Sequence, residues 1–132
     1  MRIISVLGLL FGGALSLAAQ DTQKSLNYER DIEPIIFQHC MPCHAVDNDN
    51  ESRLHLDSFD LMMKGGKNGI PVVAGKSENS ILYTKLLPNP KFGRQMPPRR
   101  KKLSQEELKL VKEWIEQGAK GMSEPGMRKP QE

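Results

Sequence analysis

The sequence predicts a small all-α domain of about four short helices separated by long loops. Apolar residues recur at helical spacing in short segments, as at Ile32, Ile35 and Ile36, and no segment shows the alternation of a β-strand. Serine precedes several of these segments, and glycine or proline follows them, as is usual at helix ends. The chain has 132 residues, which is the length of one domain.

Residues 1–20 have the pattern of a secretory signal peptide. Arg2 supplies a positive charge, residues 3–17 are mostly apolar, and small residues precede a polar stretch. The alternative is an uncleaved membrane anchor, but the apolar run is short of the roughly 20 residues of a spanning helix. We therefore expect an exported protein in the periplasm or an equivalent extracytoplasmic space. It would contact a membrane only if this segment stayed uncleaved.

The remaining chain divides into a polar lead-in at 21–27, the domain proper at 28–120 and a flexible polar tail at 121–132. The formal net charge is +3 and no nucleic-acid-binding motif is present. We therefore expect no nucleic acid among the partners of this protein.

Two helices are expected in the first half of the domain. Residues 28–39 have a helical pattern, and Pro34 is tolerated only in a first turn, so this helix should begin near Asp31. Ser58 is a suitable N-cap for a short helix over residues 59–64, which a glycine pair then ends.

Two further helices are expected in the second half. Ser77 is a suitable N-cap for a helix that runs to about Leu87, where prolines follow. The last helix has the clearest pattern, with a capping box over residues 104–107 and Gly118 as its C-terminal cap. Its apolar stripe consists of Leu108, Val111 and Ile115.

The segment Cys40-Met41-Pro42-Cys43-His44 is the strongest functional signal. The C-x-x-C-H pattern is typical of covalent attachment of a c-type haem. Thiols three residues apart lie on one side of a helical turn, so each can reach a different vinyl group of one haem. His44 is then held against the porphyrin face, where its imidazole can bind the iron. Cys40, Cys43 and His44 are therefore the predicted site for one covalently bound haem c.

Three other interpretations of the cysteine pair remain. An exported compartment permits a disulfide between Cys40 and Cys43. A zinc site normally needs four ligands, and no second cysteine pair exists. A thioredoxin-like redox pair would need a βαβ pattern around it, which is absent from the sequence. We interpret His39 as a helix-end residue that interacts with the C-terminal carbonyl groups.

The second axial ligand of the iron is predicted to be Met96. It lies in a loop in which Gly93 permits a bend and two prolines stiffen the chain directly after the methionine. A stiff loop holds a thioether over iron at low entropic cost. Met62 and Met63 fall on a helix, where methionine usually fills a core. The alternatives are His55 as ligand and an empty or differently filled sixth position.

These residues together resemble the planctomycete-type cytochrome c family, a branch of the class I cytochrome c fold. The resemblance implies a small helical fold around one haem, with Met96 as the distal ligand. Where the family usually has arginine this chain has His55, which could contact a haem propionate or face solvent. The matching segments are residues 31–36, 40–44, 54–58, 75–77, 80–82, 96–98, 103–104, 114–115 and 118–119.

A run of basic residues surrounds Met96 in the sequence. If Met96 faces iron, several of these cations ring the haem edge, where they would steer docking to an acidic redox partner. The alternative is a solvated basic loop without a partner. The residues are Lys91, Arg94, Arg99, Arg100, Lys101 and Lys102.

The function that these features predict is that of a monohaem one-electron carrier with His/Met-ligated iron, and independent catalysis is not expected. One alternative is a haem subunit of a larger oxidoreductase complex. Another is a haem-based peroxidase or sensor with a labile sixth ligand. No nucleophile–base pair and no second haem motif occur in the sequence.

Overall fold

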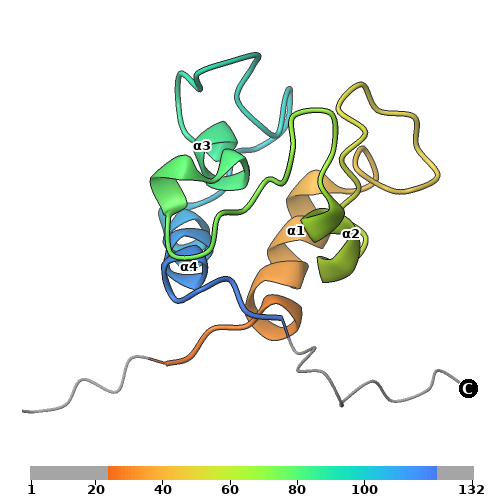
Figure 1. Cartoon of the computed structure of the whole chain (residues 1–132). Helices are drawn as coiled ribbons and strands as arrows, with labels where there is room; N and C mark the ends of the chain where they lie inside the picture. Colours follow the sequence, from red (N-terminus) through yellow and green to blue (C-terminus); the bar gives the residue numbers. More distant parts are fainter. Residues whose placement is uncertain (1–23, 122–132) are drawn as a thin grey trace, which may run out of the picture.

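The computed structural model describes residues 24–121, which form an all-α fold, as predicted (Figure 1). No strand occurs in this range, and the one β-bridge pairs Gly66 with Gly69. The predicted signal peptide, the first part of the lead-in and the tail beyond residue 121 lie outside the described residues. The helical elements are η1 (Tyr28–Ile32), α1 (Glu33–Cys40), α2 (Phe59–Lys64), η2 (Ser77–Asn79), α3 (Ile81–Leu86) and α4 (Gln105–Glu116).

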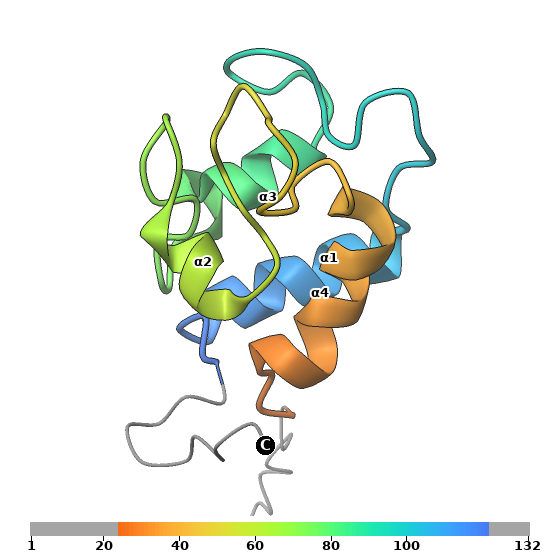
Figure 2. The same ribbon diagram turned by 90° about the vertical axis from the view of Figure 1, so that its right-hand side faces the viewer.

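Helix α4 is the central packing element, since η1, η2 and α3 all contact it. In Figures 1 and 2 the two ends of the described chain lie together at the bottom, and the long loops of residues 45–55 and 88–103 lie at the opposite end. Across residues 24–121, no helix is both long enough and apolar enough to cross a membrane.

The first helical segment begins earlier than predicted. A π-helical turn starts at Tyr28, not near Asp31, because the Asn27 side chain caps it by accepting a hydrogen bond from the Arg30 amide. The Asp31 carboxylate in turn accepts from the Asn27 amide at 3.0 Å. Pro34 lies in the first turn of α1, as its ring requires.

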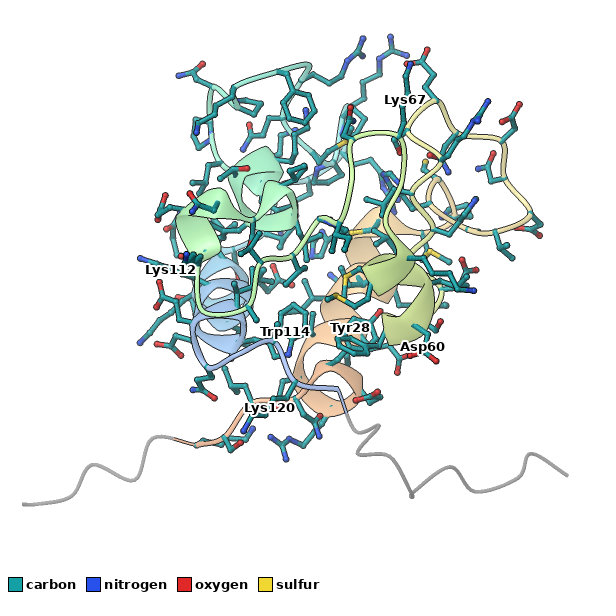
Figure 3. The ribbon with its side chains drawn as sticks, viewed as in Figure 1. Tyr28, Asp60, Lys67, Lys112, Trp114 and Lys120 are labelled. Atoms are coloured by element: carbon teal, nitrogen blue, oxygen red, sulfur yellow. The ribbon has the colours of Figure 1, made fainter. Side chains whose placement is uncertain are left out.

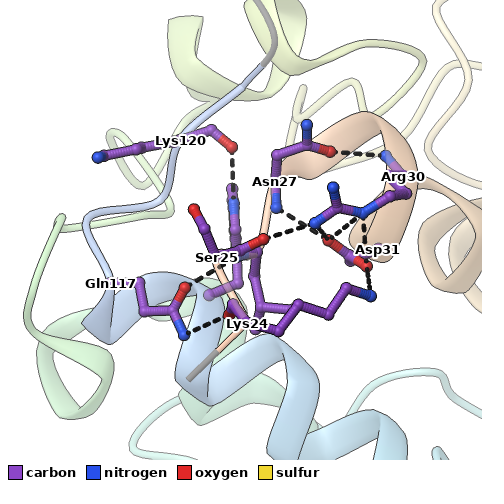
Figure 4. A network of polar contacts seen from close by, with 9 residues as sticks. Lys24, Ser25, Asn27, Arg30, Asp31, Gln117 and Lys120 are labelled. Atoms are coloured by element: carbon purple, nitrogen blue, oxygen red, sulfur yellow. Dashed lines mark hydrogen bonds and ion pairs between the residues drawn. The ribbon is translucent and has the colours of Figure 1, made fainter. Parts of the chain in front are cut away.

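A polar network joins the N-terminal segment to the end of α4 (Figure 4). The Leu26 backbone amide donates to the side-chain oxygen of Gln117 at 2.8 Å, and the side-chain nitrogen of Gln117 donates to the Lys24 carbonyl at 3.3 Å. Arg30 and Lys24 both pair with Asp31. The bond from Arg30 is the main reason why the pKa of Asp31 lies well below its ordinary value.

Three aromatic rings form the middle of the core. Trp114 and Tyr28 are fully buried and lie side by side between α4 and η1 (Figure 3), with ring centroids 6.0 Å apart. Phe59 of α2 packs 5.5 Å from Tyr28. The Lys120 carbonyl accepts hydrogen bonds from the Tyr28 amide and the Trp114 indole, both at 2.9 Å. The core therefore fixes the first and last helices against each other.

The third predicted helix is divided in two, and its predicted cap is wrong. The 3₁₀ turn η2 occupies Ser77–Asn79, and α3 begins only after Ser80. Ser77 does not cap the helix, because its hydroxyl donates to Glu116 of α4 at 2.8 Å. Ser80 is fully buried, accepts from the Val73 amide and donates to the Lys76 carbonyl. These tertiary bonds hold the break in place.

The other two helix predictions are confirmed. Helix α2 has the predicted bounds, with the Ser58 side chain as its N-cap. Helix α4 begins with the predicted capping box, in which Ser104 and Glu107 bond each other's backbone amides. Gly118 follows it with a φ of +102°, which favours glycine.

Candidate functional site

All four predicted site residues, Cys40, Cys43, His44 and Met96, line one cavity of about 450 Å³. This volume falls within the range of small-molecule and cofactor sites. The cavity lies between the end of α1, residues 50–56, the face of α3 and the loop of residues 92–100. Its wall is mainly apolar, with contributions from Leu54, Leu56, Pro71, Ile81, Leu82, Leu86, Phe92 and Pro97.

The end of α1 presents the two thiols. Cys40 is the last residue of the helix, and the next residues continue as turns in which the His44 amide donates to the Cys40 carbonyl at 3.2 Å. Both cysteines are free thiols, Cys40 half-buried and Cys43 exposed, so the structure contains no disulfide between them. Burial raises the pKa of the Cys40 thiol to about 12, which Arg100 partly opposes. Cys40 is therefore a neutral thiol at ordinary pH.

The imidazole of His44 has a fixed orientation. Its Nδ1 lies 2.9 Å from the Leu54 carbonyl oxygen, and a carbonyl can only accept, so Nδ1 carries the proton. The Nε2 lone pair is then free for a metal. The Leu56 amide donates to the His44 carbonyl at 2.8 Å, so the same segment holds both the ring and the backbone of His44. The sequence gives no sign of which carbonyl does this.

The loop that carries Met96 is attached to the end of α3. The Met96 amide donates to the Lys85 carbonyl, and the Gln95 side chain donates to the Leu86 carbonyl, both at 2.7 Å. These are carbonyl groups of a last helical turn, which have no partner within the helix. Of the described methionines, only Met96 lines the cavity, whereas Met62 and Met63 pack in the core as predicted.

Neither of the other two histidines is arranged like His44. His55 is half-buried, its Nδ1 lies 3.2 Å from the Ala45 carbonyl oxygen, and it is not among the residues that line the cavity. His39 is buried at the cavity wall, and its Nε2 lies 2.9 Å from the Glu107 carboxylate of α4. The prediction that His39 interacts with helix C-terminal carbonyls is therefore wrong.

Two members of the basic run are bound within the fold. Arg100 lines the cavity and donates to the Met41 carbonyl at 2.8 Å, next to the attachment motif. Lys102 donates to the carbonyls of Gln95 and Pro97. The remaining four are exposed, and no hydrogen bond or ion pair is described for them within residues 24–121: Lys91, Arg94, Arg99 and Lys101.

Two lysines at the cavity were not predicted from the sequence. Lys67 lines it from the loop after α2 and lies at the end of the molecule opposite the two ends of the described chain (Figure 3). Lys85 lines it from α3 and donates to the Phe92 carbonyl at 2.7 Å, with its ammonium group 4.8 Å from the centre of the Phe92 ring. Burial lowers the pKa of Lys85. Neither lysine belongs to a motif that would have marked it.

The residues present fit a covalently bound haem. Two free thiols, an imidazole with an available Nε2 and a thioether face one mainly apolar space, and histidine and methionine are axial ligands used by c-type cytochromes. No group of three or more His, Cys, Asp or Glu side chains in the described residues could hold a metal ion on its own. The zinc alternative therefore has no support in this part of the chain.

Comparison with known proteins agrees with this chemistry. Residues 40–100, from Cys40 to Arg100, match the family model described as planctomycete cytochrome C. Among solved structures, the chain is similar to Kuenenia stuttgartiensis hydrazine synthase, at 23% sequence identity and a TM-score of 0.51. The likeness covers 76% of this chain and 17% of that chain, and it shows the fold alone. No curated protein sequence matches the chain.

Proposed function

We propose that this chain, whose residues 40–100 match the planctomycete cytochrome C family model, is a monohaem one-electron carrier. The observation that carries the proposal is the presence of His44 and Met96 on one cavity that also contains both attachment cysteines. The family match supports a c-type cytochrome. Our proposal adds three points to that: one haem, iron bound by His44 and Met96, and the role of an electron carrier.

The chain's own residues would perform four tasks. Cys40 and Cys43 would attach the haem, and His44 and Met96 would bind its iron. The Leu54 carbonyl keeps the proton of His44 on Nδ1 and so leaves Nε2 available as a ligand. The mainly apolar wall would limit the access of water to a bound haem. When bound, the haem supplies an iron that exchanges one electron between its ferric and ferrous states.

Two protein ligands favour electron transfer over catalysis. A site with both axial positions filled offers no coordination position to a substrate and needs little rearrangement on a change of oxidation state. The Met96 amide and the neighbouring Gln95 side chain both donate to carbonyls of α3, which supports a stable second ligand in place of a labile one. A peroxidase or sensor would instead need an open or easily opened position.

The exposed cations near the cavity support an acidic redox partner. Lys91, Arg94, Arg99 and Lys101 have no described hydrogen bond or ion pair, whereas Arg100 and Lys102 keep their charge but donate to backbone carbonyls. Such long-range attraction raises the association rate and weakens as salt is added. The proposal therefore includes a salt-dependent encounter with an acidic protein outside the cytoplasm, to which residues 1–20 would direct the chain.

A second candidate is a haem subunit of a larger oxidoreductase. Phe37 on α1 is 74% exposed, and Val46 and Ile70 are more than half exposed, which is consistent with a stable protein interface. In addition, the similar fold forms part of a longer chain in a protein named hydrazine synthase. Size measurement of the native protein at high salt distinguishes the two, because a carrier would then migrate as a small protein and a stable subunit would stay in its complex.

The test is expression of the full chain together with cytochrome c maturation machinery. We expect a mass increase of one haem that survives denaturation, and its loss when Cys40 and Cys43 are both changed to serine. The ferrous protein should bind carbon monoxide poorly. A protein without covalent haem, or a high-spin protein that binds carbon monoxide readily, would contradict the proposal.

A further inference from the structure

The side chain of Lys102 contacts the backbone around Met96, which its position in a basic run does not indicate. It follows Met96 by six positions, and its ammonium group donates hydrogen bonds to the carbonyls of Gln95 and Pro97. These two residues are the immediate neighbours of Met96. One side chain therefore binds the backbone on both sides of the predicted iron ligand.

These bonds restrain Met96 in a way that the contacts with α3 do not. The Met96 amide and the Gln95 side chain attach the loop to the Lys85 and Leu86 carbonyls. Beyond Met96, Lys102 supplies the described hydrogen bond to the Pro97 carbonyl. The same ammonium group also lies 3.4 Å from the Gln95 carbonyl oxygen, so it contacts the backbone on both sides of Met96.

The geometry points to Lys102 as a positioning residue, which holds Met96 in place as an axial ligand. This inference rests on the proposed function, since it presupposes that Met96 binds the iron. Lys102 keeps its positive charge, but its donor group is directed at its own loop. Pre-organisation of this kind lowers the entropy cost of holding a weak ligand in place.

Lys101 is a matched control for Lys102. It carries the same charge, is exposed, and has no hydrogen bond or ion pair in the described part of the chain. Its change to alanine removes one positive charge from the same loop without removing a bond to the backbone. Any difference between the Lys101→Ala and Lys102→Ala variants therefore reports the two carbonyl contacts and not the charge.

The experiment uses the ferric holoprotein with covalent haem, in wild type and in the Lys102→Ala, Lys102→Arg and Lys101→Ala variants. Imidazole is the probe, since it competes with a weak protein ligand for the iron. Loss of the two hydrogen bonds should raise the apparent imidazole affinity about five- to tenfold in Lys102→Ala. The sulfur-to-iron charge-transfer band should also weaken. Lys101→Ala should match wild type, and Lys102→Arg, which retains donors, should largely restore the wild-type values.

Equal imidazole affinity in Lys102→Ala and Lys101→Ala would overturn the inference, whether both match wild type or both differ from it. Equal covalent haem content and equal helix content by circular dichroism show that a changed affinity does not reflect misfolding. Failure of the proposed function has a different signature. In that case the wild type would lack the charge-transfer band, or Met96→Ala would keep it, and the role of Lys102 would then fail as well.

Discussion

Replacement of Glu107 by alanine tests the link between the attachment motif and the last helix. One carboxylate oxygen lies 2.9 Å from His39 Nε2, and the other accepts from the Ser104 amide at 2.7 Å. The first contact joins the end of α1, next to Cys40, to the start of α4. The second is half of the capping box. Glu107→Ala removes both at once and leaves the buried imidazole of His39 without this partner.

The expected loss of stability follows from these two contacts. The capping hydrogen bond from the Ser104 amide to Glu107 contributes about 1 kcal/mol to stability. A buried polar group left without its partner costs about 1–3 kcal/mol. The sum is about 2–4 kcal/mol, which is a large part of the roughly 5–15 kcal/mol that stabilises a typical domain. Because a described contact of His39 is lost, the change should also loosen the wall of the cavity.

The assay is urea unfolding of the ferric holoprotein at neutral pH, with Glu106→Ala as the control. Glu106 is in the same helical turn and exposed, so its loss should cost only a few tenths of a kcal/mol. A double-mutant cycle with His39→Ala should give a coupling energy of about 1–2 kcal/mol. A Glu107→Ala variant as stable as Glu106→Ala, or a coupling energy near zero, would refute the reasoning.

Three further predictions concern the rest of the fold. The pKa of Asp31 is lower in the folded protein than in the unfolded chain, so its contribution to folding stability is complete above about pH 5 and is lost progressively at lower pH. Asp31→Asn should therefore reduce the loss of stability that acid causes, as measured by urea unfolding over a range of pH. In Gly66→Ala, the added Cβ would lie 2.5 Å from the Ser52 carbonyl oxygen and 2.9 Å from the Leu54 amide nitrogen, so the free energy of unfolding should fall by about 1–3 kcal/mol. Because Leu54 orients His44, the electronic spectrum of the holoprotein should change as well. Trp114→Ala should cost about 3–5 kcal/mol in urea unfolding, and Trp114→Phe clearly less; equal losses would contradict the packing described for this ring.

Local signals in the sequence were sufficient for much of the fold. Ser58 and Ser104 are both N-caps as predicted, because a cap depends on residues within one turn. The attachment motif is local in the same sense, since Cys40, Cys43 and His44 are joined by one turn of chain. Met96 was predicted from its stiff loop and from the family resemblance, and the structure places it on the cavity of the motif.

Contacts between residues far apart in the sequence could not be predicted. Ser77 is a residue type that often caps helices, but its hydroxyl donates to Glu116, which lies 39 positions away. His39 and Glu107 are 68 positions apart, so nothing near either residue shows that they pair. The Leu54 carbonyl belongs to a loop without a periodic pattern, and any backbone carbonyl could have served His44. In each case tertiary packing decides which partner is used.

The most direct test of the central claim is the electronic spectrum of the ferric holoprotein in wild type and Met96→Ala, with Met63→Ala as the control. Met63 is a methionine of similar burial that packs against the core and does not line the cavity. We expect a sulfur-to-iron charge-transfer band in wild type and Met63→Ala, and its loss in Met96→Ala. A wild-type spectrum without that band, or a Met96→Ala spectrum that keeps it, would contradict His44/Met96 ligation.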